Sequence, residues 1–232
     1  MLLHYIKIAL RNLRKYPAQT AISVLGLAAG FVCLSLSALW MHYENTYDTM
    51  HKDYERIYTF QDEQHGNSRG EQTRGSTLVT SCSVYKALLQ DLPEVEAVCA
   101  AQLNELMDGI FEEITLLVMH IDERFPTVFD VPLQEGDLAF LERKEENHVA
   151  ISEPLARLLF PDATHYVGNK FHLINDMELV VDAVYEPFDV HSLFAGYNMI
   201  MYRDFNPEWG WRDAIFAKLH EGVDVQAFSD KV

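Results

Sequence analysis

The sequence is short of basic residues, and this shortage excludes some functions at the outset. Its 232 residues carry 18 Lys and Arg against 35 Asp and Glu, a net charge of −17. Binding to nucleic acid begins with the neutralisation of phosphates, so this balance argues against a nucleic-acid partner. Hydrophobic residues make up 49% of the chain and aromatic residues 12%, which excludes a disordered acidic chain. The length suffices for one or two domains with a buried core.

The signatures of common catalytic and cofactor sites are also missing. The sequence contains no GxxxxGK[ST], HExxH, GxSxG or paired CxxC pattern. Its ten histidines are scattered and its acid pairs fit a solvated surface. We therefore expect no catalytic residue, no cofactor and no metal, and a chain that is not an enzyme. A metal site built from His51, His65 and nearby acids is the weaker alternative.

Charge is absent altogether from one long stretch, residues 17–43. The 16 residues before it hold four basic residues and no acid, whereas residues 44–232 hold 14 basic and all 35 acidic residues, a net charge of −21. A soluble globular protein rarely separates its charges in this way. The order is a basic head, an uncharged middle and an acidic body.

The uncharged middle has the length of a membrane span. Of residues 21–41, 16 of 21 are apolar, and at about 1.5 Å per residue they make a helix of roughly 31 Å, close to the thickness of the hydrocarbon core. Trp40 and Tyr43 suit the far interface. A buried helix and a cleaved signal peptide are the less favoured alternatives. The positive-inside rule then places residues 1–16 in the cytoplasm and residues 44–232 outside.

The basic head and the span each carry a second pattern. On a helical wheel the basic side chains of Lys7, Arg11, Arg14 and Lys15 share one side of a helix opposite an apolar face, which predicts a helix in the membrane interface. A generic basic flank is the alternative. Within the span, Gly26 and Gly30 form a GxxxG motif, which predicts a face that packs against other helices.

The body has the patterns of an α+β domain. Apolar and alternating segments predict strands over 56–60, 95–102, 114–121, 171–174, 178–185, 197–202 and 215–219. Helical spacing and caps predict helices over 78–92, 125–131 and 152–160, and a last one begins after Asp224. Residues 65–76 are expected to form a loop, and 142–147 a solvated charge run. Because the chain stops inside its last helix, we expect the front part of a longer protein.

Two of the three cysteines fall in the exported body. Cys82 lies about 14 Å before the end of the predicted helix and Cys99 about 13 Å into the following strand. The two residues therefore have similar heights, and a disulfide between them is geometrically feasible in an oxidising compartment. Cysteine is also a common small core residue, and that alternative stays open.

Several segments resemble the MacB/FtsX-type ABC transporter permeases, most closely the variants common in Bacteroidota. The resemblance begins with residues 5–13 (YIKIALRNL), 22–30 (ISVLGLAAG), 47–51 (YDTMH) and 56–58 (RIY). It continues through residues 92–98 (LPEVEAV), 129–137 (FDVPLQEGD), 151–160 (ISEPLARLLF) and 167–170 (VGNK). The first 60 residues are the most specific part, and the similarity covers essentially the whole chain.

The resemblance implies an inner-membrane permease subunit in three parts. These are a cytoplasmic interfacial helix over 1–16, a transmembrane helix over 17–43 and a MacB-like periplasmic core domain over 44–232. The core domain is expected to have two lobes, one from about 44–119 and 196–232, the other from about 120–195. This sequence has one span where such permeases have several.

The resemblance also implies the partners. A separate cytoplasmic ABC ATPase would drive movements that the spans transmit to the periplasmic domain, acting on extracytoplasmic cargo. Other partners would be the remaining transmembrane helices or a second permease copy, membrane lipid and a periplasmic adaptor. The alternatives are a membrane-anchored binding or sensor domain without transport activity and an anchored periplasmic enzyme.

Overall fold

The structure, a computed structural model, describes residues 11, 14–60, 62–65, 74–90, 92–108, 115–173 and 176–231. It divides into two compact units, Met1–Tyr47 and Asp48–Val232, where the sequence predicts a boundary after residue 43. Most of the predicted interfacial helix, including Lys7, lies outside the described residues. Of its basic residues, Arg11, Arg14 and Lys15 are described as helical and exposed.

The first unit consists chiefly of helix α2, Pro17–Asn45. Pro17 begins the helix, where its missing N–H costs nothing, and none of the helix residues is buried in the described structure. The helix is long and apolar enough to cross a membrane. The predicted span is thus confirmed as a helix, with two more residues at its C-terminal end.

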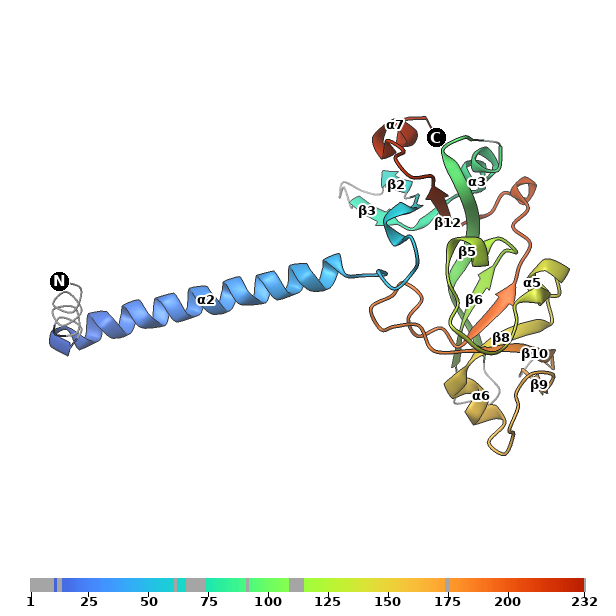
Figure 1. Cartoon of the computed structure of the whole chain (residues 1–232), viewed down its shortest axis with the longest axis horizontal. Coiled ribbons are helices and arrows are strands. Elements are labelled where there is room, and N and C mark those ends of the chain that lie inside the picture. Colours follow the sequence, from blue (N-terminus) through green and yellow to red (C-terminus); the bar gives the residue numbers. More distant parts are fainter. Residues whose placement is uncertain are drawn as a thin grey trace. The chain divides into compact units, whose positions relative to one another are not determined.

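The second unit is an α+β domain built on one large sheet (Figure 1). Its strands are β1 Ile57–Thr59, β2 Asp62–His65, β3 Arg74–Thr77, β4 Val79–Ser81, β5 Val95–Asp108, β6 Thr115–Ile121, β7 Leu133–Gly136, β8 His148–Ser152, β9 Lys170–His172, β10 Glu178–Tyr185, β11 Met199–Tyr202 and β12 Arg212–Leu219. Its helices are η1 Tyr54–Arg56, α3 Cys82–Leu88, α4 Phe125–Val128, α5 Ala139–Arg143, α6 Glu153–Leu159, η2 Pro207–Trp209 and α7 Val225–Ser229.

Ten of the described strands form the main sheet, in the order β1-β12-β5-β6-β11-β8-β10-β7. Strand β4 also pairs with β12, and β9 with β10, whereas β2 and β3 pair separately. The pairs β6–β11 and β8–β10 are parallel, and the other pairs are antiparallel. The strands predicted over 171–174 and 178–185 are observed as β9 and β10, which pair antiparallel with His172 opposite Glu178.

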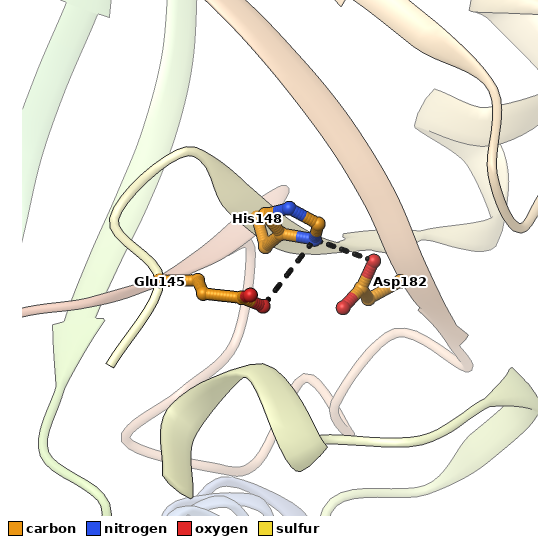
Figure 2. A group of neighbouring side chains, drawn as sticks. All are labelled: Glu145, His148 and Asp182. Atoms are coloured by element: carbon orange, nitrogen blue, oxygen red, sulfur yellow. Dashed lines mark hydrogen bonds and ion pairs between the residues drawn. The ribbon is translucent and has the colours of Figure 1, made fainter. Parts of the chain in front are cut away.

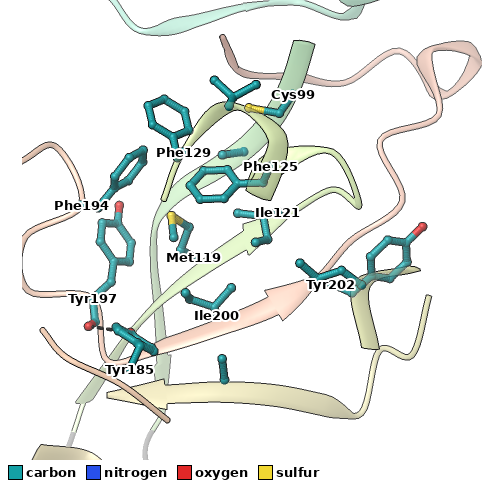
Figure 3. Packing of buried hydrophobic residues seen from close by; sticks show 14 of the residues in the cluster. Cys99, Met119, Ile121, Phe125, Phe129, Tyr185, Phe194, Tyr197, Ile200 and Tyr202 are labelled. Carbon is teal, nitrogen blue, oxygen red and sulfur yellow. Dashed lines mark hydrogen bonds between the residues drawn. The ribbon is translucent and has the colours of Figure 1, made fainter. Parts of the chain in front are cut away.

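One continuous core covers a single face of this sheet (Figure 3). Residues of six neighbouring strands point into it, and α4, α5 and the loop between β10 and β11 cover it. Phe194, from that loop, lies at its centre, with ring centroids 4.8 Å from Phe129 and 5.3 Å from Phe125. Rings at these separations and steep angles pack edge to face, which stabilises beyond their buried area.

The opposite face carries two separate cores. One lies under α3 and α7 and includes Tyr85, Trp211 and Phe228, and the other lies under α6 and includes Leu155, Phe171 and Met199. The first consists of residues of predicted lobe one, and the second mostly of lobe two. The sheet and the core that covers its first face are both continuous, and Asp48–Val232 is one unit. The division into two lobes stays a prediction.

The elements differ from the predicted ones chiefly where distant strands pair. The predicted helix over 78–92 begins only at Cys82, because Val79–Ser81 pair as β4 with β12. Strands β7 and β8 and helix α5 lie where no element is predicted, and strand β3 lies mostly within the predicted loop over 65–76. The predicted cap of the last helix is confirmed, since the Asp224 carboxylate accepts from the backbone N–H groups of Gln226 and Ala227.

Candidate functional site

The candidate site is the segment that enters the domain after helix α2, residues 48–59, called here the junction segment. Its first residue, Asp48, follows the end of the helix by three residues. Asp48 adopts a left-handed backbone conformation with φ 56°, which aspartate tolerates better than most residues. The junction segment then forms η1 and strand β1, which pairs with β12 at one edge of the sheet.

Asp48 fastens the junction segment to the loop between β10 and β11, residues 186–198. Its backbone N–H donates to the carbonyl of His191 at 3.0 Å. Its Oδ1 accepts from the Ser192 hydroxyl at 2.7 Å and from the Leu193 N–H at 2.9 Å. Hydrogen bonds to a carboxylate are among the stronger ones in proteins. One residue therefore joins two segments that lie 144 positions apart.

His51 inserts its ring into the continuous core. It is 3% exposed, and its centroid lies 5.0 Å from that of Phe129 and 5.7 Å from that of Phe194, both edge to face. Neither ring nitrogen has a hydrogen-bond partner in the described structure. Burial lowers the pKa of His51 below its ordinary value, and the charges of Asp48 and Asp130 oppose this effect. The neutral ring acts as an aromatic anchor.

Four charged groups make the third attachment. Arg56 forms ion pairs with Asp53, at 3.0 Å, and with Glu96 on β5. Lys218 on β12 contacts the same two carboxylates at 3.0 and 3.2 Å. The hydrogen bond from Lys218 lowers the pKa of Asp53, and that from Arg56 lowers the pKa of Glu96. Cations and anions alternate, so the network holds the junction segment against two strands.

A buried carboxylate lies where α3, β5 and β6 meet. Asp122 is 1% exposed, and its Oδ2 accepts from the Tyr85 hydroxyl at 2.6 Å and the Ala100 N–H at 3.0 Å. Its Oδ1 accepts from the Arg124 N–H at 3.1 Å. Burial raises the pKa of Asp122 from 3.8 to about 6. The group is fully hydrogen-bonded, which marks it as a structural connection between the two faces of the sheet.

A cluster at the other end of the sheet contains metal-ligating residue types. Glu145, His148 and Asp182 each offer a ligand atom within 4.8 Å of the others, and Figure 2 shows both carboxylates next to the same ring nitrogen. His148 Nδ1 lies 2.8 Å from Asp182 Oδ1 and 3.7 Å from Glu145 Oε2. The cluster is not recognisable in the sequence, because Asp182 is 34 positions from His148.

The two glycines predicted for helix packing have open space around them in the described structure. At Gly26 and Gly30, an added Cβ would meet no described atom within 4 Å.

Cys82 and Cys99 are both free in the described structure, so the disulfide considered between them is not formed. A similar position along the strand direction does not suffice for a disulfide, because the two side chains lie on opposite faces of the sheet. Cys99 points into the continuous core, whereas Cys82 packs on the other face with α3. Cys99 is instead a small core residue.

The described chain thus joins one helix long enough to cross a membrane to an α+β domain built on a mixed sheet. The family of MacB-like periplasmic core domains matches residues 20–232. The chain belongs to this family, and thus carries the periplasmic domain of a MacB/FtsX-type ABC transporter permease. No match is found among the curated proteins.

The fold of the domain is similar to that of a solved structure with a TM-score of 0.60. A domain of a permease protein from Porphyromonas gingivalis is 17% identical, with a TM-score of 0.60 over 78% of this chain and 82% of that one. The extracellular domain of the noncanonical ABC-type transporter YknZ from Gram-positive bacteria is 15% identical, with a TM-score of 0.47 over 75% and 86%. The periplasmic region of MacB from Actinobacillus actinomycetemcomitans is 15% identical, with a TM-score of 0.45 over 75% and 78%.

Proposed function

We propose that this chain is the N-terminal part of an ABC permease subunit that transmits movement from its membrane helix to its periplasmic domain. A partner ATPase in the cytoplasm supplies the energy by hydrolysing ATP, and the periplasmic domain acts on extracytoplasmic cargo. The remaining transmembrane helices or a second permease copy complete the membrane part. A periplasmic adaptor is a further partner.

The triple attachment of the junction segment carries this proposal. Asp48 follows the helix by three residues, so the connecting chain can span at most about 11 Å. A displacement of the helix end that stretches the connection to this length must be passed to Asp48 and, through it, to the loop over the continuous core. The His51 ring and the Arg56 network pass the same displacement to the core and to strands β5 and β12.

The distribution of charge supports the proposed orientation in the inner membrane. Four basic residues, Lys7, Arg11, Arg14 and Lys15, precede the uncharged helix, and the domain behind it is strongly acidic. Basic residues at the cytoplasmic side would also meet anionic lipid and lie near the ATPase. Protease added to intact spheroplasts should digest the domain. Reversal of the four charges to Glu should reduce or invert insertion, and an unchanged topology would contradict this orientation.

The transmission can be measured in the full permease with its ATPase in lipid nanodiscs. Spin labels at the exposed Val190 in the loop and at the exposed Leu158 on α6, at the opposite face of the sheet, report the distance between the loop and the rest of the domain. We expect ATP to change this distance in the wild-type protein. The variant Asp48→Ala should hydrolyse ATP but lose most of the change, whereas Glu146→Ala, an exposed acid elsewhere, should behave as wild type. An equal ATP-dependent change in Asp48→Ala, or failure of the ATPase to co-purify with the wild type, would refute the proposal.

A further inference from the structure

The Glu145–His148–Asp182 cluster is built on fixed backbone. His148 begins β8, and its N–H donates to the carbonyl of Glu145 at 3.3 Å. The N–H of Glu145 in turn donates to the carbonyl of Phe140 in α5 at 3.0 Å. Phe140 is fully buried. The turn that carries Glu145 is therefore tied to the core, and the side chains are presented by a rigid scaffold (Figure 2).

Asp182 reaches the cluster through a β-bulge. Val181 pairs with Val149 and Ala183 with Ala150, so Asp182 is an extra residue of β10 without a partner in β8. Leu179 and Val181 point into the core under α6, whereas Ala183 and Tyr185 point into the continuous core. The bulge thus shifts by one residue the alternation of side chains between the two faces of the sheet. Asp182, at the shift, is free of this alternation and reaches the cluster. Bulges of this kind often aim a side chain at a functional site.

The donor set suits a transition-metal ion. Zinc binds imidazole nitrogen and carboxylate oxygen at about 2.0–2.2 Å, which places the ligand atoms of a tetrahedral site roughly 3.3 Å apart. The measured separations of 2.8 and 3.7 Å lie on either side of that value. Calcium and magnesium prefer all-oxygen sites, so the imidazole favours zinc. His148 is about one-third exposed and Asp182 less so, which leaves an approach from solvent.

One cation already bridges the two carboxylates. Arg143 Nε donates to Glu145 Oε2 at 2.7 Å, and its Nη2 donates to Asp182 Oδ2 at 2.8 Å. The Arg143 side chain is half exposed, so it can turn into water without uncovering the core. It would then compete with a metal for the same oxygens and lower the apparent affinity.

We infer that Glu145, His148 and Asp182 bind one zinc ion, which displaces Arg143 from both carboxylates. His148 contributes Nδ1, each carboxylate contributes one oxygen, and water completes the coordination. The ion links the turn after α5 to strands β8 and β10. Arg143 holds the carboxylates together when zinc is scarce, so the cluster keeps its geometry in both conditions.

The test is a zinc titration of the whole chain in detergent micelles, in competition with a fluorescent zinc chelator. We expect His148→Ala, and separately the isosteric Asp182→Asn, to bind one zinc ion fewer than wild type. Arg143→Ala should bind that ion at least about tenfold more tightly, because a charge-assisted competitor is removed. His172→Ala is the matched control: His172 lies 3.7 Å from Glu178 outside the cluster, and its loss should change nothing.

A second measurement reports on the coordination itself. Cobalt(II) in the site should give the visible absorption of a four- or five-coordinate centre in wild type and none in His148→Ala. Zinc should also raise the thermal unfolding midpoint of wild type but not of His148→Ala. Identical titrations of wild type and His148→Ala, or an unchanged affinity in Arg143→Ala, would overturn the inference.

Discussion

Asp48 Oδ1 accepts hydrogen bonds from both the Ser192 hydroxyl and the Leu193 N–H, which makes one carboxylate oxygen the fastening point of the loop over the continuous core. Asp48→Ala removes both bonds and places alanine at φ 56°. We expect it to destabilise the domain by about 2–4 kcal/mol.

Asp48→Asn is the matched control, because asparagine keeps an oxygen acceptor and tolerates the left-handed conformation. It should cost less than about 1.5 kcal/mol. Chemical unfolding of the whole chain in micelles, followed by the fluorescence of buried Trp211, measures both values. Equal losses in the two variants would show that the fastening contributes little.

His51 keeps two nitrogens without hydrogen-bond partners in the described core. His51→Leu replaces the ring by an apolar side chain of similar size, so stability at pH 7.5 should stay equal or rise by about 1–2 kcal/mol. The exposed His172→Leu should leave stability unchanged. A loss of more than about 2 kcal/mol in His51→Leu would show that the aromatic contacts outweigh the buried nitrogens.

The lowered pKa of His51 also predicts a pH dependence. The unfolded chain binds a proton at the ordinary value of 6.5, whereas the folded protein binds it only at lower pH. Folding stability should therefore be complete above pH 6.5 and fall as the pH drops below it. His51→Leu should lack this component, which is read from the difference between wild type and variant from pH 7.5 to 5.

Asp122 should act in the opposite direction. Its folded pKa of about 6 exceeds its ordinary 3.8, so the folded protein binds the proton more tightly. Its contribution is greatest below pH 4 and is lost as the pH rises towards 6, by up to about 3 kcal/mol. The stability difference between wild type and Asp122→Asn should shift accordingly over this range.

Tyr85→Phe provides the control for this carboxyl. The hydrogen bond from Tyr85 lowers the pKa of Asp122 against the effect of burial, so its removal should extend the loss of stability to a pH above 6. If the wild-type profile between pH 4 and 6 matches those of both variants, Asp122 does not titrate as described.

Gly136 lies where strand β7 touches β10. Its φ is 78°, and an added Cβ would lie 1.9 Å from the carbonyl oxygen of Asp182. Gly136→Ala should cost more than about 3 kcal/mol, because backbone must shift. Gly168→Ala has a similar φ of 84° with no described atom within 4 Å, and should cost about 1 kcal/mol. Similar losses would mean that φ alone sets the cost.

Gly26 and Gly30 remain the predicted packing face of helix α2. Gly26→Leu should weaken assembly with the other transmembrane helices, because close approach needs small residues. Ala28→Leu makes a comparable change on the opposite side of the helix and should be tolerated. Co-purification of the tagged subunits in mild detergent compares the two, and equal recovery would argue against a packing role.

Local patterns predicted the elements whose residues fit only one type of secondary structure. The span, strands β6, β10 and β12 and the Asp224 cap follow from apolar runs and one capping residue. Strand β4 was missed because residues 78–92 also have helical spacing, and only the distant strand β12 decides between the two.

The candidate sites were less predictable for the same reason. Asp48 and His51 lie in the segment 47–51 that resembles the permeases, but their contacts in the loop at 186–198 depend on the tertiary fold. Asp182 joins His148 only through a bulge, which strict alternation does not reveal. The disulfide considered between Cys82 and Cys99 is not formed, because the face of the sheet to which a side chain points decides which residues meet. Their similar position along the strand direction does not.

The pairing of β1 with β12 has a consequence for biosynthesis. Ile57 can pair only after Lys218 has been synthesised, about 160 residues later in the chain. Strands β4 and β5 also pair with β12. At roughly 5–20 residues per second, this delay lasts roughly 8–32 s. For that time the nascent chain exposes an unpaired sheet edge and apolar side chains that β12 later covers, and both features make a partly folded chain prone to aggregation.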